Sequence, residues 1–229
     1  MAAEREFKRA IELNPSDALG HLFYSFDLAV MGRLYEGMAE IRRAWELDPL
    51  SLFVNTIVGW HFYVRRHYEQ AIEHWQKTLE MEPNFFIAHW TLWRVFRVKG
   101  RLEEALDECR KTFSLRANRE VVEAIEVGHA ESGYGGAMRR AAQTLVAQSE
   151  ARYVLPTDIA MFYTHAEEKD QALQWLEKAY EERDPWLHAL GVEPDWESLH
   201  PDARFQALLQ RLGLPEVNPS NSVLQPSKH

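Results

Sequence analysis

Three prolines at one spacing constrain this chain more than any other feature. Pro15, Pro49 and Pro83 are each 34 residues apart. Each follows a segment that closes with polar or acidic residues. Proline ends a helix because it has no backbone N–H and its ring clashes with the preceding turn. A fixed period of about 20–50 residues is typical of stacked supersecondary units, so the spacing predicts an array of repeated helical segments.

A second set of positions shares this period and marks a turn inside each unit. Gly32, Arg66 and Gly100 are also 34 residues apart, and similar helix starts follow them. Each unit is therefore predicted to be a hairpin of two helices. The first helix ends at this turn, and the second ends before the proline.

Small and bulky residues recur at matching places within the units. In the first unit Ala3, Phe7, Ala10 and Pro15 occupy these places. Small residues let two helices approach to about 8–10 Å, and large ones fill the gap beside them. The pattern resembles the tetratricopeptide repeat. That resemblance implies an all-α solenoid of stacked antiparallel helix pairs, wound as a right-handed superhelix with a C-terminal capping helix.

The resemblance divides the chain into units. The first residues carry only the second-helix pattern, so we expect the chain to begin partway through a repeat whose N-terminal portion is missing. The period drifts after Ala117 and stops at Pro185. The predicted units are 1–17 (the second helix of a truncated repeat), 18–51, 52–85, 86–117, 118–152 (degenerate), 153–185, 186–214 (the C-terminal cap) and 215–229 (a flexible tail).

Several segments match a narrower group of proteins. Residues 7–15, 48–52, 170–173 with 176–180, and 202–209 resemble the C-terminal repeat region of bacterial multidomain signalling proteins. In those families the repeats follow a winged-helix regulator, a nucleotide cyclase or a serine/threonine kinase domain. The resemblance implies a sensory or scaffolding segment, without indicating which effector domain precedes it.

Composition excludes several classes of partner. The formal net charge of −9 repels phosphate backbones, so direct binding of nucleic acid is not expected. The single cysteine, Cys109, cannot form an internal disulfide and is expected to be a buried, inert thiol. The sequence contains neither a long apolar run nor a basic-then-apolar leader, so we expect no membrane contact and a cytoplasmic location.

Function in a stack of helix pairs is expected on the concave face, which the first helices line. Aromatic and arginine side chains often dominate binding energy, and here they predict a partner with apolar side chains and an acidic group. The predicted partner-binding groove comprises Phe26, Phe53, Trp60, Tyr63, Trp90, Arg94, Arg97, Glu126, His129, Met161 and His165.

Each part of this groove also has a purely structural interpretation. Trp60 and Trp90 can equally pack between neighbouring helices, and Arg94 and Arg97 can lie on a solvated face with acidic neighbours. The known carboxylate clamp of this fold uses Lys, Asn and Arg at set positions. Here apolar residues and a threonine replace them, so neither that clamp nor its chaperone partner is expected. The corresponding residues are Leu22, Phe26, Ile57, Ile87 and Thr91.

Histidines and carboxylates show no pattern that predicts chemistry. His61 and His67 are six residues apart and do not share a helical face, so we expect no metal site and no cofactor. Glu126 and His129 have the spacing of an ordinary surface pair. We therefore expect no catalytic residue and no enzymatic activity.

Three hypotheses follow. The first is a protein-interaction module that binds a partner peptide or helix in the groove. The second is a homodimer that forms through apolar surface around Phe7 and Ile11. The third, an enzyme or small-ligand sensor, needs a closed pocket with convergent polar groups, and no sequence cluster indicates one.

Overall fold

The computed structural model describes residues 2–215, and all regular elements in that range are helical. Of the tail predicted at 215–229, all but Pro215 lies outside the described residues. The elements are α1 (Ala2–Leu13), α2 (Ala18–Val30), α3 (Leu34–Leu47), α4 (Leu52–Val64), α5 (Tyr68–Met81), α6 (Phe86–Val98), α7 (Leu102–Leu115), α8 (Arg119–Ser149), α9 (Pro156–His165), α10 (Lys169–Glu181), the 3-10 helices η1 (Pro185–Ala189) and η2 (Pro194–Leu199), and α11 (Ala203–Leu212).

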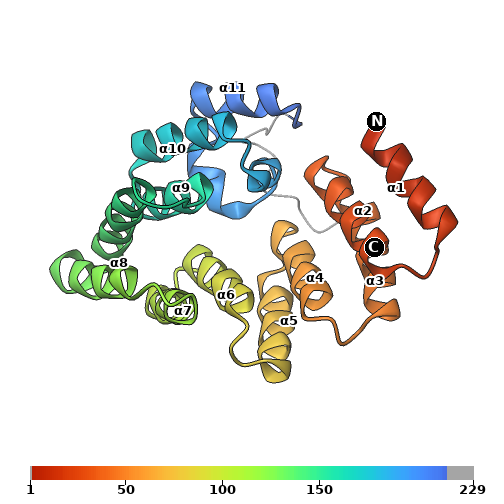
Figure 1. The fold of residues 1–229 in the computed structure, drawn as a ribbon, viewed down its shortest axis with the longest axis horizontal. Coiled ribbons are helices and arrows are strands. Elements are labelled where there is room, and N and C mark those ends of the chain that lie inside the picture. Colours follow the sequence, from red (N-terminus) through yellow and green to blue (C-terminus); the bar gives the residue numbers. More distant parts are fainter. Residues whose placement is uncertain (1, 216–229) are drawn as a thin grey trace, which may run out of the picture.

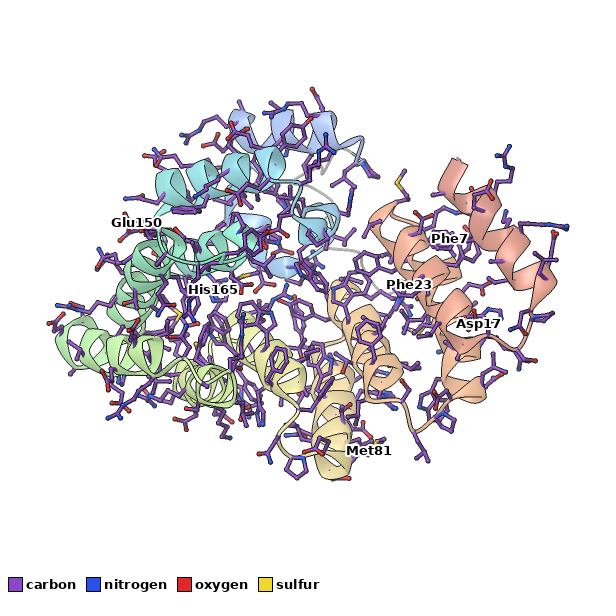
Figure 2. The ribbon with its side chains drawn as sticks, viewed as in Figure 1. Phe7, Asp17, Phe23, Met81, Glu150 and His165 are labelled. Carbon is purple, nitrogen blue, oxygen red and sulfur yellow. The ribbon has the colours of Figure 1, made fainter. Side chains whose placement is uncertain are left out.

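The helices stack as antiparallel pairs along an arc that starts at α1 and returns to α11 (Figure 1). His165 lies toward the inside of this arc, whereas Met81 and Glu150 lie at its outer edge (Figure 2). The fold is the all-α solenoid of tetratricopeptide type that the 34-residue period predicts. Helices α2 to α7 and α9 to α10 form the successive pairs.

The repeated positions adopt the backbone conformations that their spacing indicates. Helices α1, α3 and α5 each end two residues before a proline, at Pro15, Pro49 and Pro83 respectively. Gly32 and Gly100 turn the chain with φ of 79° and 73°. This left-handed region suits glycine because glycine has no Cβ. Arg66 occupies the same position with φ of 66°, so the turn geometry is conserved between units even where glycine is not.

Close helix packing explains the small residue at Gly59. A Cβ built there would come within 2.3 Å of the Trp75 indole nitrogen. Trp75 is 1% exposed, and its indole N–H donates to the carbonyl of Thr56 at 3.0 Å. The glycine on α4 and the tryptophan on α5 therefore form one complementary contact. Two neighbouring apolar clusters built from such contacts make up the core.

The degenerate unit predicted at 118–152 is one long helical element with an internal break. Ser132 and Gly133 leave the helical region, with φ of −151° and 64°. The two halves then pack so closely that a Cβ on Gly128 would lie 2.3 Å from the carbonyl oxygen of Gly136. Glycines at both positions permit this tight hairpin.

Two identical substitutions should change stability in opposite directions. Ala117 is exposed and has φ of 54°, in the left-handed region, so Ala117→Gly should raise the free energy of unfolding by about 1 kcal/mol. Ala39 is exposed inside α3, and Ala39→Gly should lower it by about 1 kcal/mol. Urea unfolding followed by circular dichroism measures both, and equal signs would contradict the turn assignment.

Candidate functional site

The C-terminal segment returns into the arc and occupies part of its concave face. Residues 185–199, which form η1 and η2, lie inside the arc of helices (Figure 1). η2 contacts α6 and α9, and η1 contacts α10. Pro185 and Pro194 start the two short helices, a position where the missing N–H of proline costs nothing. We call residues 185–199 the docked segment.

Asp195 is the central contact of the docked segment. Its side chain is 0% exposed. One carboxylate oxygen accepts from the Tyr63 hydroxyl at 2.7 Å and from Arg94 Nε and Nη2 at 3.0 and 2.5 Å, and the other accepts from His165 Nε2 at 3.0 Å. These donors come from α4, α6 and α9. A single buried carboxylate thus holds three first helices together.

Opposing effects act on the pKa of Asp195. Burial raises it, but the Arg94 charge and the His165 hydrogen bond outweigh burial and hold the pKa well below its usual range. The carboxylate is therefore ionised in the folded protein. A buried charge is tolerated only when it is paired and hydrogen-bonded, and this one has both.

Glu193 and Arg66 attach the docked segment on either side. Glu193 accepts from the indole N–H groups of Trp60 and Trp196 at 2.9 and 3.2 Å and lies 2.7 Å from Arg94 Nη2. Arg66 donates to the carbonyl of Val192 at 2.9 Å and to Glu197 at 2.7 Å. These bonds offset the cost of the left-handed backbone at Arg66.

A chain of hydrogen bonds supports His165 from the side away from Asp195. The Trp93 indole N–H donates to the Tyr134 hydroxyl at 2.8 Å, and that hydroxyl lies 3.3 Å from His165 Nδ1. Burial lowers the pKa of His165 to about 4, although its bond to Asp195 favours the charged form. A neutral imidazole that accepts at Nδ1 and donates at Nε2 satisfies both contacts. Its role here is to position Asp195.

Beside the docked segment, the concave face contains a cavity of about 350 Å³. We call it the aromatic cavity. Its apolar lining is Phe26, Phe53, Ile57, Trp60, Phe86, Ile87, Trp90, Leu155, Met161, Trp186 and Trp196. Its polar lining is Thr56, Thr91, Arg94, Arg116, Thr157, Asp158 and Glu193.

Asp158 is one of two carboxylates in the cavity wall. It lies in the first turn of α9, and its carboxylate accepts from Arg116 Nη1 at 3.3 Å. Its side chain is only 13% exposed. Burial raises the pKa of Asp158 to about 6, against the opposing effect of the Arg116 charge. At this distance the ion pair is too weak to compensate for the lost hydration.

The structure separates the predicted groove residues into three groups. Phe26, Phe53, Trp60, Trp90, Arg94 and Met161 line the aromatic cavity. Tyr63 and His165 bind Asp195. Arg97, Glu126 and His129 lie outside the cavity lining, and His129 Nε2 is 3.6 Å from Glu103. Their binding of an external partner stays a prediction.

Sequence reasoning missed the contribution of the docked segment. Residues 186–214 were expected to cover the end of the array, and Leu190, Trp196, Leu199, Phe205 and Leu208 are indeed buried. Trp186, expected to be covered too, is 51% exposed at the cavity. The available signal was the stretch 193–197, in which three carboxylates and a tryptophan surround one proline.

Other predicted features can be located in the structure. Cys109 is buried, and burial raises the pKa of its thiol. Over residues 2–215, no three His, Cys, Asp or Glu side chains are placed to hold a metal ion. None of the helices in that range is both long enough and apolar enough to cross a membrane.

Comparison with known proteins supports the repeat assignment. Residues 59–113 match the model of the tetratricopeptide repeat family. A comparison with curated protein sequences gives no match. The family match thus falls within the stretch from α4 to α7, which lies in the middle of the helical stack.

Three solved structures are among those that match this chain. The crystal structure of YrrB, described as a TPR protein with an unusual peptide-binding site, is 21% identical with a TM-score of 0.47, covering 80% of this chain and 95% of that one. The crystal structure of MamA is 17% identical with a TM-score of 0.45, covering 80% and 88%. Naa15/Naa10 bound to HypK-THB is 16% identical with a TM-score of 0.44, covering 90% and 33%.

Removing the buried carboxylate should be costly. Asp195→Ala leaves Arg94 with one carboxylate and leaves Tyr63 and His165 without an acceptor. We expect the free energy of unfolding to fall by about 3–5 kcal/mol in urea titrations. Glu36→Ala, which removes an exposed pair with Arg33, serves as the control and should change it little. Similar effects of the two variants would show that the docked segment is not an integral part of the fold.

Asp158 should make stability depend on pH. The pKa of its carboxyl is about 6 in the folded protein and about 3.9 in an unfolded chain, so folding favours the protonated form. The associated stability is present below about pH 4 and is lost as pH rises through 6. The free energy of unfolding of the Asp158→Asn variant, relative to that of the parent protein, should therefore increase by as much as about 3 kcal/mol between pH 4 and 7. A difference in unfolding free energy that stays constant with pH would contradict this.

Proposed function

We propose that this protein binds a segment of a partner polypeptide on its concave face, with the aromatic cavity as the anchor site. The observation that carries the proposal is an apolar cavity that stays accessible after the docked segment is in place. Phe86 and Trp186 line it and are 40% and 51% exposed. The residues of a partner that contribute most to binding energy typically insert into apolar, aromatic-lined pockets of this kind.

The apolar surface extends beyond the cavity along α2. Leu19 and Phe23 are each 49% exposed and precede Phe26 by seven and three residues, so the three share one helical face. A partner anchored in the cavity can therefore continue along this face. An extended strip of this kind suits a peptide or a helix better than a compact metabolite.

The wider setting belongs to the same proposal. The sequence of residues 7–15, 48–52, 170–173 with 176–180, and 202–209 resembles repeat regions of bacterial signalling proteins. On that basis we propose that the chain serves as the non-catalytic, protein-binding part of a larger cytoplasmic signalling or regulatory protein. Nucleic acid and membrane are not proposed as partners.

The alternative of self-association has less structural support. Phe7 and Ile11, around which it was expected, are partly buried, and the Phe7 ring lies 5.9 Å from that of Tyr24. One face of α1 is therefore already packed on α2. A homodimer through this end of the array stays a prediction, and light scattering at several concentrations tests it.

Site-specific photocrosslinking tests the proposed function. A benzoylphenylalanine residue placed at position 86 lies at the cavity, and one placed at Tyr35, which is 75% exposed on α3, lies outside it. In lysate of the source cell, position 86 should crosslink to one discrete polypeptide, and position 35 should not. The crosslink should disappear in the Trp186→Ala variant and persist in Trp45→Ala, which removes an exposed tryptophan outside the cavity. Identical crosslinks from both positions would refute the proposal.

A further inference from the structure

We propose that the partner anchors in the aromatic cavity through an uncharged aromatic side chain and contributes no carboxylate to it, because the docked segment already supplies the acidic groups of this groove. This inference rests on the proposed function and specifies its partner. It departs from the partner with an acidic group that the sequence predicts.

The acid-binding groups of the groove are already engaged. Arg94 binds both Asp195 and Glu193, and the Tyr63 hydroxyl donates to Asp195. Both oxygens of Glu193 also accept indole N–H groups, from Trp60 and Trp196. A carboxylate from an external partner would have to displace a buried network that spans α4, α6 and α9.

The charges in the cavity wall are paired with one another. The lining contains two arginines and two carboxylates, which form the pairs Arg94 with Glu193 at 2.7 Å and Arg116 with Asp158 at 3.3 Å. The wall therefore has no formal net charge to complement. A charged group that entered would lose its hydration without gaining a free counter-charge. An uncharged side chain avoids that cost.

The shape and lining of the cavity favour an aromatic ring. Its volume of about 350 Å³ is near the lower end of the range of about 300–1,000 Å³ typical of ligand pockets, which suits one or two large side chains. Rings of Phe26, Trp60, Phe86, Trp90, Trp186 and Trp196 line it. Phe26 and Trp60 already stack at 4.8 Å. Aromatic rings pack favourably in offset and edge-on arrangements with such walls.

The docked segment forms one side of the cavity, through Trp186, Glu193 and Trp196. Residues of α2, α4, α6 and α9 form the other side, together with Arg116 and Leu155. Asp195 does not line the cavity but holds the docked segment. The site is therefore composite, and loosening the docked segment from outside the cavity should weaken binding inside it.

A matched set of small probes tests the inference on the full chain. Indole-3-propionamide is neutral, indole-3-propionate is its anionic counterpart, and tryptamine is a cationic one. 3-Cyclohexylpropionamide keeps the neutral amide and replaces the aromatic ring. Each is titrated into the protein while the indole N–H signals of the eight tryptophans are followed by NMR. The signals of Trp60 and Trp196 are expected to shift, because both line the cavity.

We expect the neutral indole to bind about tenfold more tightly than either charged probe and than the cyclohexyl probe, a difference of about 1.4 kcal/mol. Trp186→Ala, at a half-exposed position, should weaken it by about tenfold, and Thr91→Phe should block it by filling the cavity from α6. Asp195→Asn should weaken binding of the neutral indole, although Asp195 is not one of the residues that line the cavity. Trp45→Ala should leave the affinity for the neutral indole unchanged.

Four results would overturn the inference. The first two are binding of the anion or the cation that is as tight as that of the neutral indole or tighter, and equal binding of the cyclohexyl probe. The other two are binding of the neutral indole that none of the cavity variants alters, and failure to detect binding of the neutral indole at all. Because crosslinking from position 86 does not depend on these probes, a positive crosslink with a negative probe result would reject the neutral aromatic anchor and retain the proposed function.

Discussion

The organisation of the concave face depends on one buried carboxylate. Asp195 accepts hydrogen bonds from Tyr63, Arg94 and His165, which belong to three helices and lie 132, 101 and 30 residues earlier in the chain. A helical-repeat array otherwise joins only neighbouring units. Here a single side chain links α4, α6 and α9 through the interior of the arc. Loss of the Asp195 carboxylate would leave these buried donors unpaired, and each unpaired buried donor costs free energy.

This link changes how the groove can work. The docked segment takes up the arginine and the polar aromatic groups that a tetratricopeptide-type groove would otherwise offer to a partner, and it leaves an apolar cavity beside them. The cavity is bounded by both the array and the docked segment. Under the proposed function, recognition of an apolar anchor and docking of the segment would be energetically coupled, because each completes the surface that the other contacts.

Part of this could be predicted from residue patterns. Helix ends follow from the prolines, and the inner turns follow from Gly32 and Gly100, because these depend on backbone sterics within a few residues. The aromatic side of the concave face also followed from helical periodicity, which placed Phe26, Trp60 and Trp90 there. The ion-pair partners of Arg94 could not be predicted from the sequence. Glu193 and Asp195 lie in a segment without helical periodicity, and the local sequence does not indicate that this segment packs against the helices.

The sequence by itself determined that this chain is a stack of helix pairs with an aromatic concave face, because a 34-residue period of prolines, turns and small residues acts through local sterics and nearest-neighbour packing. The tertiary structure decided which groups on that face remain available. Residues 185–199 fold back and bury Asp195 and Glu193 against α4, α6 and α9. A buried charge is stabilised by groups that lie far apart in the sequence and come together only when the chain folds. Trp60 and Glu193, which are hydrogen-bonded although 133 residues separate them, are an example.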